Sequence, residues 1–259
     1  MSDPYSVLID TCAMAKLSFY CELCDSVKKE YGTELSALYS SLPKPLTEDS
    51  LETKTAKIGY KYYKHLRDLS NNGNILLHFS LFTRIELFDV FLDISTDELL
   101  ATQGIPFRVR RKKPFRWQVQ FDFNKNVVSR YETIIKCLDA MGITISCPEE
   151  DTRSSYRLAF MINEILSSHV FLDSFDSYLY SLGLFLMVDE ILTDDGEFEK
   201  IMEDFSTKPE WETHRETVKT EIIKIDSDYK ELCAIEREDG SVLDVDLSKF
   251  KFPQMIKLQ

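Results

Sequence analysis

Short apolar runs alternate along the chain with longer stretches of helical periodicity. Four runs have the character of buried strands, at residues 7–9, 74–79, 142–146 and 190–192. Helical spacing of apolar positions occupies residues 17–27, 58–69, 80–92, 152–167 and 173–188. Strands that alternate with helices predict a mostly parallel central sheet covered by helices on both faces, the three-layer α/β/α class.

Turn-forming residues and a change of pattern suggest where the elements and domains end. Residues 41–55 carry two prolines and mixed charge and predict a loop. Past residue 205, Pro209 opens a helix, and residues 229–237 and 241–247 flank Asp239-Gly240, which indicates a β-hairpin. We therefore expect a main domain over residues 1–205 and a C-terminal module, a helix plus a β-hairpin, over residues 206–259.

Acidic residues stand at predicted strand ends and in the first turns of predicted helices. In a parallel α/β sheet, ligands bind outside the carboxyl ends of the strands. Clustered carboxylates need a cation, and oxygen-only ligands suit Mg²⁺ or Mn²⁺, which promote phosphoryl transfer to water. The alternative is that these acids cap helices or face solvent. The candidates are Asp10, Glu86, Asp173, Asp176, Asp194 and Asp195.

Four motifs in order along the chain resemble those of PIN-domain nucleases. The first strand, Val7-Leu8-Ile9, closes with Asp10-Thr11, and residues 80–87 match the pattern S-x-x-T-x-x-E-L. The stretch that begins at Asp176 is similar to the helix that carries the third acid of the family. Residues 193–198 are similar to its closing T-x-D-x-x-F. Relative to this family, the domain over residues 1–205 has insertions at about 28–72 and 96–140.

The resemblance implies a metal-dependent endoribonuclease that holds one or two Mg²⁺ or Mn²⁺ ions and leaves a 5′-phosphate and a 3′-hydroxyl. Asp173 is an alternative to Asp176, and Asp194 an alternative to Asp195. The chain departs from the family at Cys12, where Asn or Ser is common. The implied catalytic and metal-binding acids are Asp10, Glu86, Asp176 and Asp195, supported by Thr11 and Thr193.

The charge of the chain is unevenly distributed. The net charge of -13 opposes nucleic-acid binding, yet residues 105–136 hold nine Lys or Arg against two acids. Cations interleaved with aromatic rings could contact phosphates and stack on unpaired bases, so we expect single-stranded or looped RNA as a partner. The alternative is a solvated loop or an edge hairpin. The expected nucleic-acid contacts are Arg108, Arg110, Arg111, Lys112, Lys113, Arg116 and Trp117.

Three functions compete on this evidence. The first is the endoribonuclease, either of the toxin type with an inhibitory, antitoxin-like protein partner or an RNA-processing enzyme. The second is a non-catalytic PIN-like module that binds RNA or protein. A haloacid-dehalogenase-type phosphatase is disfavoured because Cys12 stands where that chemistry needs a second Asp. We further expect no membrane segment, a cytoplasmic location with reduced cysteines, and, from the family, a homodimer.

Overall fold

The structure is a computed structural model of the chain, and it describes residues 4–42, 51–110, 112, 122–148, 155–228, 234–236, 242–244 and 246–258. The chain divides into two compact units. The sheet unit comprises Met1–Ala13, His65–Thr83 and Ile143–Gln259. The helical unit comprises Met14–Lys64 and Arg84–Gly142. Three helices contribute residues to both units, namely α1 (Thr11–Ser26), α3 (Leu51–Asn72) and α4 (Leu81–Thr102).

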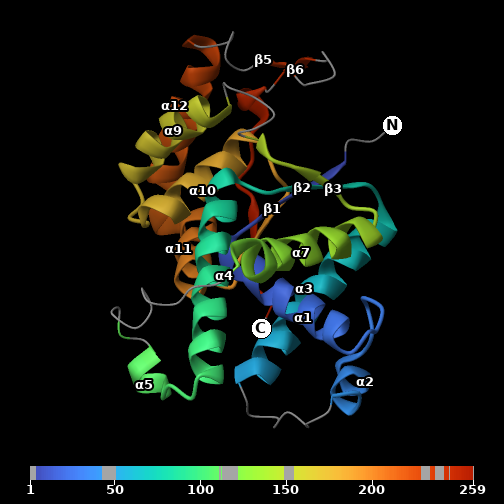
Figure 1. Cartoon of the computed structure of the whole chain (residues 1–259). Coiled ribbons are helices and arrows are strands. Elements are labelled where there is room, and N and C mark those ends of the chain that lie inside the picture. The colour runs from blue at the N-terminus through green and yellow to red at the C-terminus, as the bar shows by residue number, and fades with distance from the viewer. Residues whose placement is uncertain are drawn as a thin grey trace. The chain divides into compact units, whose positions relative to one another are not determined.

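A five-stranded, all-parallel sheet lies at the centre of the sheet unit, in the order β3-β2-β1-β4-β7 (Figure 1). In the pairing of β1 with β4, Ile9 lies opposite Leu192. Because all strands run in the same direction, their carboxyl ends lie along one edge of the sheet. The strands are β1 (Tyr5–Ile9), β2 (Ile75–His78), β3 (Thr144–Ser146), β4 (Glu190–Leu192) and β7 (Gln254–Ile256).

Helices cover both faces of this sheet within the unit. Leu8 and Ile191, which point to the same face, share a buried core with four helices. Figure 1 shows three of these helices, α9, α10 and α12, grouped on one side of the strands. On the opposite face, His65 of α3 lies 2.7 Å from the carboxylate of Glu190 in β4. The four helices are α9 (Ser155–Ser167), α10 (Ser174–Phe185), α11 (Gly196–Thr207) and α12 (Glu212–Asp228).

The remaining elements of the sheet unit follow α11. Residues 206–259, expected as a separate C-terminal module, belong to the sheet unit, and their strand β7 pairs with β4. The predicted hairpin is confirmed, because β5 (Ala234–Glu236) pairs antiparallel with β6 (Val242–Asp244). Two short 3₁₀ turns complete the unit, η2 (Pro209–Trp211) and η4 (Leu247–Lys249).

The helical unit has its own aromatic core between α1 and α3. The ring of Tyr20 lies 5.1 Å from that of Tyr60 and 5.2 Å from that of Tyr63, between ring centroids. Gly59 permits this close approach, because a Cβ added there would clash with the backbone oxygen of Lys16. The unit also contains α2 (Leu35–Ser40), α5 (Phe107–Arg110), the π-helical turn η1 (Asn124–Val128) and α7 (Ser129–Ala140).

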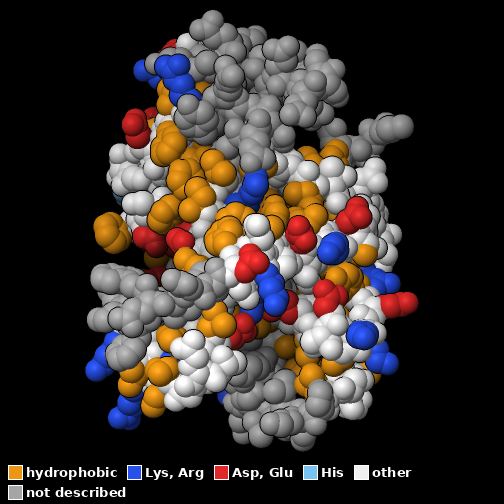
Figure 2. All heavy atoms as spheres, viewed as in Figure 1, with side chains coloured by type: hydrophobic (Ala, Val, Ile, Leu, Met, Phe, Trp, Pro, Cys, Tyr) orange, Lys and Arg blue, Asp and Glu red, His pale blue; other side chains and the backbone are white. Residues whose placement is uncertain are grey.

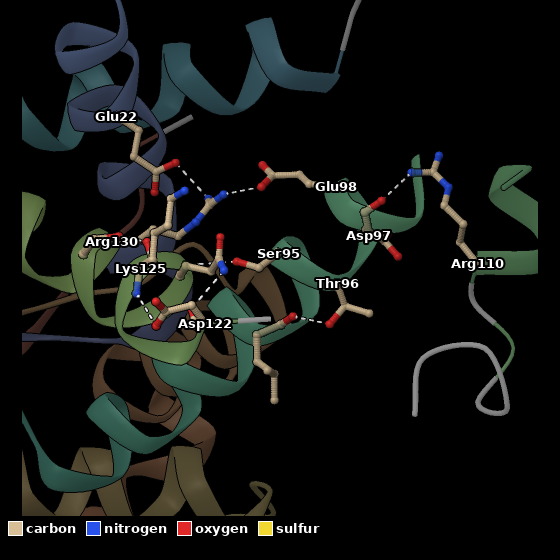
Figure 3. A network of polar contacts seen from close by, with 12 residues as sticks. Glu22, Ser95, Thr96, Asp97, Glu98, Arg110, Asp122, Lys125 and Arg130 are labelled. Atoms are coloured by element: carbon tan, nitrogen blue, oxygen red, sulfur yellow. Dashed lines mark hydrogen bonds and ion pairs between the residues drawn. The ribbon is translucent and has the colours of Figure 1, made fainter. Parts of the chain in front are cut away.

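One arginine connects three helices of the helical unit. Arg130 of α7 reaches between Glu22 of α1 and Glu98 of α4 (Figure 3), at 2.8 and 2.6 Å. The Arg130 side chain is 13% exposed, so solvent screens the pair with Glu22 only partly. Burial nevertheless raises the pKa of Glu22 to about 7, which shows that desolvation outweighs the neighbouring guanidinium.

The α/β class and the four predicted strands are confirmed, but several elements differ from expectation, among them α2, α5 and α7, which the sequence did not predict. α3 begins at Leu51, so the predicted loop over residues 41–55 is wrong for residues 51–55, while residues 43–50 lie outside the described part of the chain. α4 continues to Thr102 rather than ending near residue 92. β7 has no counterpart in the sequence prediction. Among the helices that the structure describes, none is long and apolar enough to cross a membrane.

Candidate active site

Asp10 is the central residue of the candidate site and follows β1 directly. Its backbone N–H donates to the carbonyl of Leu192 at 2.9 Å, which extends the pairing of β1 with β4 by one residue. The residue is 6% exposed. Its Oδ1 accepts from the N–H of Thr11 at 2.6 Å, and its Oδ2 accepts from the hydroxyl of Thr193 at 2.8 Å. The carboxylate is therefore fixed in place from two adjacent strands.

Thr193 links the end of β4 to the end of β1. Its side chain is fully buried, and its hydroxyl donates to Asp10 and accepts from the N–H of Asp195 at 2.9 Å. Asp195 in turn begins α11, where its Oδ1 accepts from the N–H groups of Glu197 and Phe198 at 2.8 and 3.1 Å. This cap accounts for one oxygen of Asp195, which so far supports the structural interpretation of that acid.

The pKa of Cys12 indicates which carboxylates lie near this edge of the sheet. Its thiol reaches the surface, yet partial desolvation by the surrounding protein raises its pKa to about 12. Four carboxylates add to this increase, in decreasing order those of Asp10, Asp195, Asp194 and Asp176. All four therefore lie within electrostatic reach of one sulfur atom, although they come from three separate segments of the chain.

The two candidate acids of α10 have different surroundings. Asp173 is exposed and caps the helix, because its Oδ1 accepts from the N–H groups of Phe175 and Asp176 at 3.0 Å each. Asp176 is half-buried and contributes to the raised pKa of Cys12. The cap supports a structural interpretation of Asp173, and a role of Asp176 in the site stays a prediction.

Glu86 belongs to the other unit. Thr83, in the sheet unit, is 2% exposed, and its hydroxyl lies 3.5 Å from the carbonyl oxygen of Ile9, the residue before Asp10. Glu86 follows three residues later in α4, one helical turn further along the same face, and lies in the helical unit. A role for Glu86 beside the other acids stays a prediction.

The chemistry of these side chains fits Mg²⁺ or Mn²⁺ better than it fits a softer metal. The set that acts on Cys12 offers carboxylate oxygens, which such cations prefer. Within the described ranges, however, no three or more His, Cys, Asp or Glu side chains come together closely enough to hold a metal ion. The ligand set therefore stays a proposal about which residues take part.

The predicted nucleic-acid contacts are only partly described. Arg108 and Lys112 are exposed, whereas Arg110 donates to the backbone carbonyl of Asp97 at 2.8 Å (Figure 3). Arg110 therefore has a structural partner within the helical unit. On the face shown in Figure 2, the described acidic and basic side chains are interspersed with hydrophobic ones. The other predicted contacts, Arg111, Lys113, Arg116 and Trp117, lie outside the described residues.

Lys257 lies at the same edge of the sheet, and no sequence motif marks it as a candidate. It directly follows β7, whose last residue, Ile256, accepts at its carbonyl from the N–H of Thr193 at 3.1 Å. Its amino group lies against Gly196, where an added Cβ would clash with Nζ. The only sequence signal was the apolar pair Met255-Ile256 after Pro253, which is too short to predict a strand.

The chain matches no protein-family model, no curated protein and no solved structure. The resemblance to PIN-domain nucleases therefore depends on the four sequence motifs alone. It stays a prediction, and so do the ligands and the activity that it implies.

Proposed function

We propose that this chain is a metal-dependent endoribonuclease that hydrolyses RNA phosphodiester bonds. The observation that carries the proposal is the buried carboxylate of Asp10, which accepts from the hydroxyl of Thr193, while the same hydroxyl accepts from the backbone N–H of Asp195. Strand ends at the carboxyl edge of a parallel sheet are where α/β proteins bind ligands. The four sequence motifs agree with this placement.

In this proposal Asp10, Asp176 and Asp195 hold Mg²⁺ or Mn²⁺, and the role of Glu86 stays a prediction from the family resemblance. The bound ion would supply Lewis acidity and lower the pKa of a water molecule. The residues of the chain have a positioning role. Thr193 fixes one oxygen of Asp10 and the N–H of Thr11 fixes the other, so the carboxylate is pre-oriented.

The second candidate function is a non-catalytic module of the same fold that binds RNA or a protein. Two observations favour it, namely the absence of a metal-holding group among the described residues and the helix-capping role of Asp195. The two functions differ in their response to metal. Only the nuclease requires the acids to bind a cation together.

The test is cleavage of a mixed-sequence single-stranded RNA by the full chain in EDTA, Mg²⁺ or Mn²⁺. Asp10→Asn removes the central charge, and Asp204→Asn makes the same change in α11, where Asp204 pairs with Lys208. We expect metal-dependent cutting that Asp10→Asn reduces about a hundredfold or more and Asp204→Asn leaves unchanged. We also expect Mg²⁺ or Mn²⁺ to raise the thermal unfolding temperature of wild type more than that of Asp10→Asn.

Two outcomes would contradict the nuclease. RNA binding without any cutting and without a metal-dependent thermal shift would favour the non-catalytic module. Equal cutting by wild type and Asp10→Asn would show that the activity does not come from this site.

We also propose a cytoplasmic location. Five of the six cysteines lie in the described residues, and all five, Cys12, Cys21, Cys24, Cys137 and Cys147, are free thiols. Free thiols suit a reducing compartment. An inhibitory protein partner and a homodimer stay expectations from the family resemblance.

A further inference from the structure

Lys257 follows the last of three adjacent parallel strands in the sheet unit. β1, β4 and β7 are neighbours, and their first residues beyond the carboxyl ends are Asp10, Thr193 and Lys257. Neighbouring strands lie about 4.8 Å apart, so the backbones of Asp10 and Lys257 are about 10 Å from each other along this edge. A lysine side chain spans much of that distance.

The Lys257 side chain extends to the start of α11. Its amino group lies against Gly196, which directly follows Asp195. A Cβ at residue 196 would meet this amino group, so the lysine side chain would have to move. The positive charge of Lys257 therefore lies at the carboxyl edge of the sheet, next to the turn that contains Asp195.

The charges at this edge of the sheet indicate a role for Lys257. A phosphodiester is an anion, and the carboxylates of Asp10 and Asp195, on either side of Thr193, would repel it. An ammonium group is a compact charge that binds phosphate oxygens without demanding a fixed orientation. We propose that Lys257 contacts a phosphate of the RNA strand and offsets this repulsion, an inference that rests on the nuclease proposed above.

The alternative is a structural role, in which Lys257 only neutralises nearby acids. The two roles predict different results when the charge is removed. A phosphate contact predicts a loss of RNA affinity, an increased KM and a weaker dependence of binding on salt. A structural role predicts lower stability with unchanged RNA affinity.

The experiment uses four full-length variants. RNA binding is measured in the Asp10→Asn background, and cleavage is measured in the wild-type background. Lys257→Gln removes the charge, Lys257→Arg keeps it, and Gly196→Ala keeps it but displaces the amino group. Lys251→Gln is the matched control, because it removes one positive charge at the other end of β7, where Lys251 pairs with Asp189. Affinity for a fluorescent single-stranded RNA is measured by anisotropy at several KCl concentrations.

We expect Lys257→Gln to weaken binding about tenfold and to reduce the slope of log K against log[KCl] by about 0.7, the value for one phosphate contact on a single strand. Gly196→Ala should weaken binding in the same direction, whereas Lys257→Arg and Lys251→Gln should bind like the parent. In cleavage, Lys257→Gln should raise KM more than it lowers kcat.

Equal affinity and equal salt slope for Lys257→Gln and Lys251→Gln would overturn the inference while leaving an active nuclease intact. Wild-type protein that neither binds nor cuts RNA in the presence of Mg²⁺ or Mn²⁺ would overturn the proposed function, and this inference with it. The two failures are therefore distinguishable in one set of measurements.

Discussion

Replacing Thr193 with valine should destabilise the sheet unit more than its small change in shape suggests. Valine has nearly the shape of threonine but lacks the hydroxyl, so Thr193→Val removes the bond to Asp10 at 2.8 Å and the bond from the N–H of Asp195 at 2.9 Å. The side chain is fully buried, so water cannot replace either bond without rearrangement. Thr193→Ser is the matched control, since it keeps the hydroxyl and loses a methyl group.

The magnitude follows from the two bonds. A hydrogen bond to a charged group contributes about 1.5–3 kcal/mol and one between neutral groups about 1 kcal/mol, which gives a loss of about 3 kcal/mol for Thr193→Val. This corresponds to a change of about two orders of magnitude in the ratio of folded to unfolded protein. Thr193→Ser should lose about 1 kcal/mol through its buried methyl group.

The assay is urea unfolding at pH 7 followed by tryptophan fluorescence in a Trp117→Phe background. The remaining tryptophan, Trp211, packs on Phe205 at 5.8 Å between ring centroids and therefore reports on the sheet unit. Far-UV circular dichroism provides a second probe of the same transition. If Thr193→Val is no less stable than Thr193→Ser, the hydroxyl does not organise the site and the reasoning is refuted.

Three further predictions concern other parts of the fold. Gly59→Ala should destabilise the helical unit by about 2 kcal/mol despite its better helix propensity, because its methyl group meets the backbone of Lys16. Gly73→Ala, with open space around its Cβ, should change stability by less than about 0.5 kcal/mol, and urea unfolding followed by far-UV circular dichroism measures both variants. Burial lowers the pKa of His78 from 6.5 to about 4, so between these pH values the unfolded chain binds a proton that the folded chain does not. The free energy of unfolding should therefore fall as the pH decreases from 6.5 to 4. Between pH 7 and 4.5, wild type should lose about 2.5 kcal/mol more than His78→Gln. Arg130→Met should destabilise the helical unit by about 2–3 kcal/mol. Arg130→Lys should recover less than half of this loss, because an ammonium group cannot pair with Glu22 and Glu98 in the way that the two guanidinium nitrogens do. Equal stability of Arg130→Met and wild type would contradict a stabilising role.

The strands that carry the candidate site could be predicted from the sequence. Parallel strands are buried on both faces, so each appears as a continuous apolar run, and residues 7–9 and 190–192 were found in this way. Topology then determines that the residues after these runs, Asp10 and Thr193, lie at the same edge. Their proximity therefore required no knowledge of side-chain packing.

Elements that depend on distant partners were not predictable. β7 has three residues and forms a strand by pairing with β4, so its sequence has no alternation long enough to detect. The first turns of α3 carry many polar side chains and resemble a loop in the sequence, and their contact with Tyr39 of α2, which donates to the carbonyl of Thr53, is not visible there. The missing strand also concealed Lys257, because its position beside the acids follows from the pairing of β7.

The choice among neighbouring acids likewise needed the three-dimensional structure. Asp173 and Asp176 lie within one turn of each other, and helical periodicity alone cannot say which one faces the end of β1. In the structure Asp173 caps α10, whereas Asp176 contributes to the raised pKa of Cys12. Asp194 and Asp195 both contribute to that pKa, although Asp195 also caps α11.

Helix capping explains a single acid at the start of a helix, and it explains the position of Asp173. Capping alone does not explain why carboxylates from three segments of the chain all raise the pKa of Cys12. Groups of titratable side chains with perturbed pKa values are concentrated at functional sites, although structural ion-pair networks also perturb pKa values. The positive charge of Lys257 at the same edge agrees with this interpretation, because a site that binds both a cation and a phosphate needs negative and positive side chains. A purely structural origin would require the acids to stabilise the fold, and the unfolding of the Thr193 variants measures that contribution separately from the RNA affinity of the Lys257 variants.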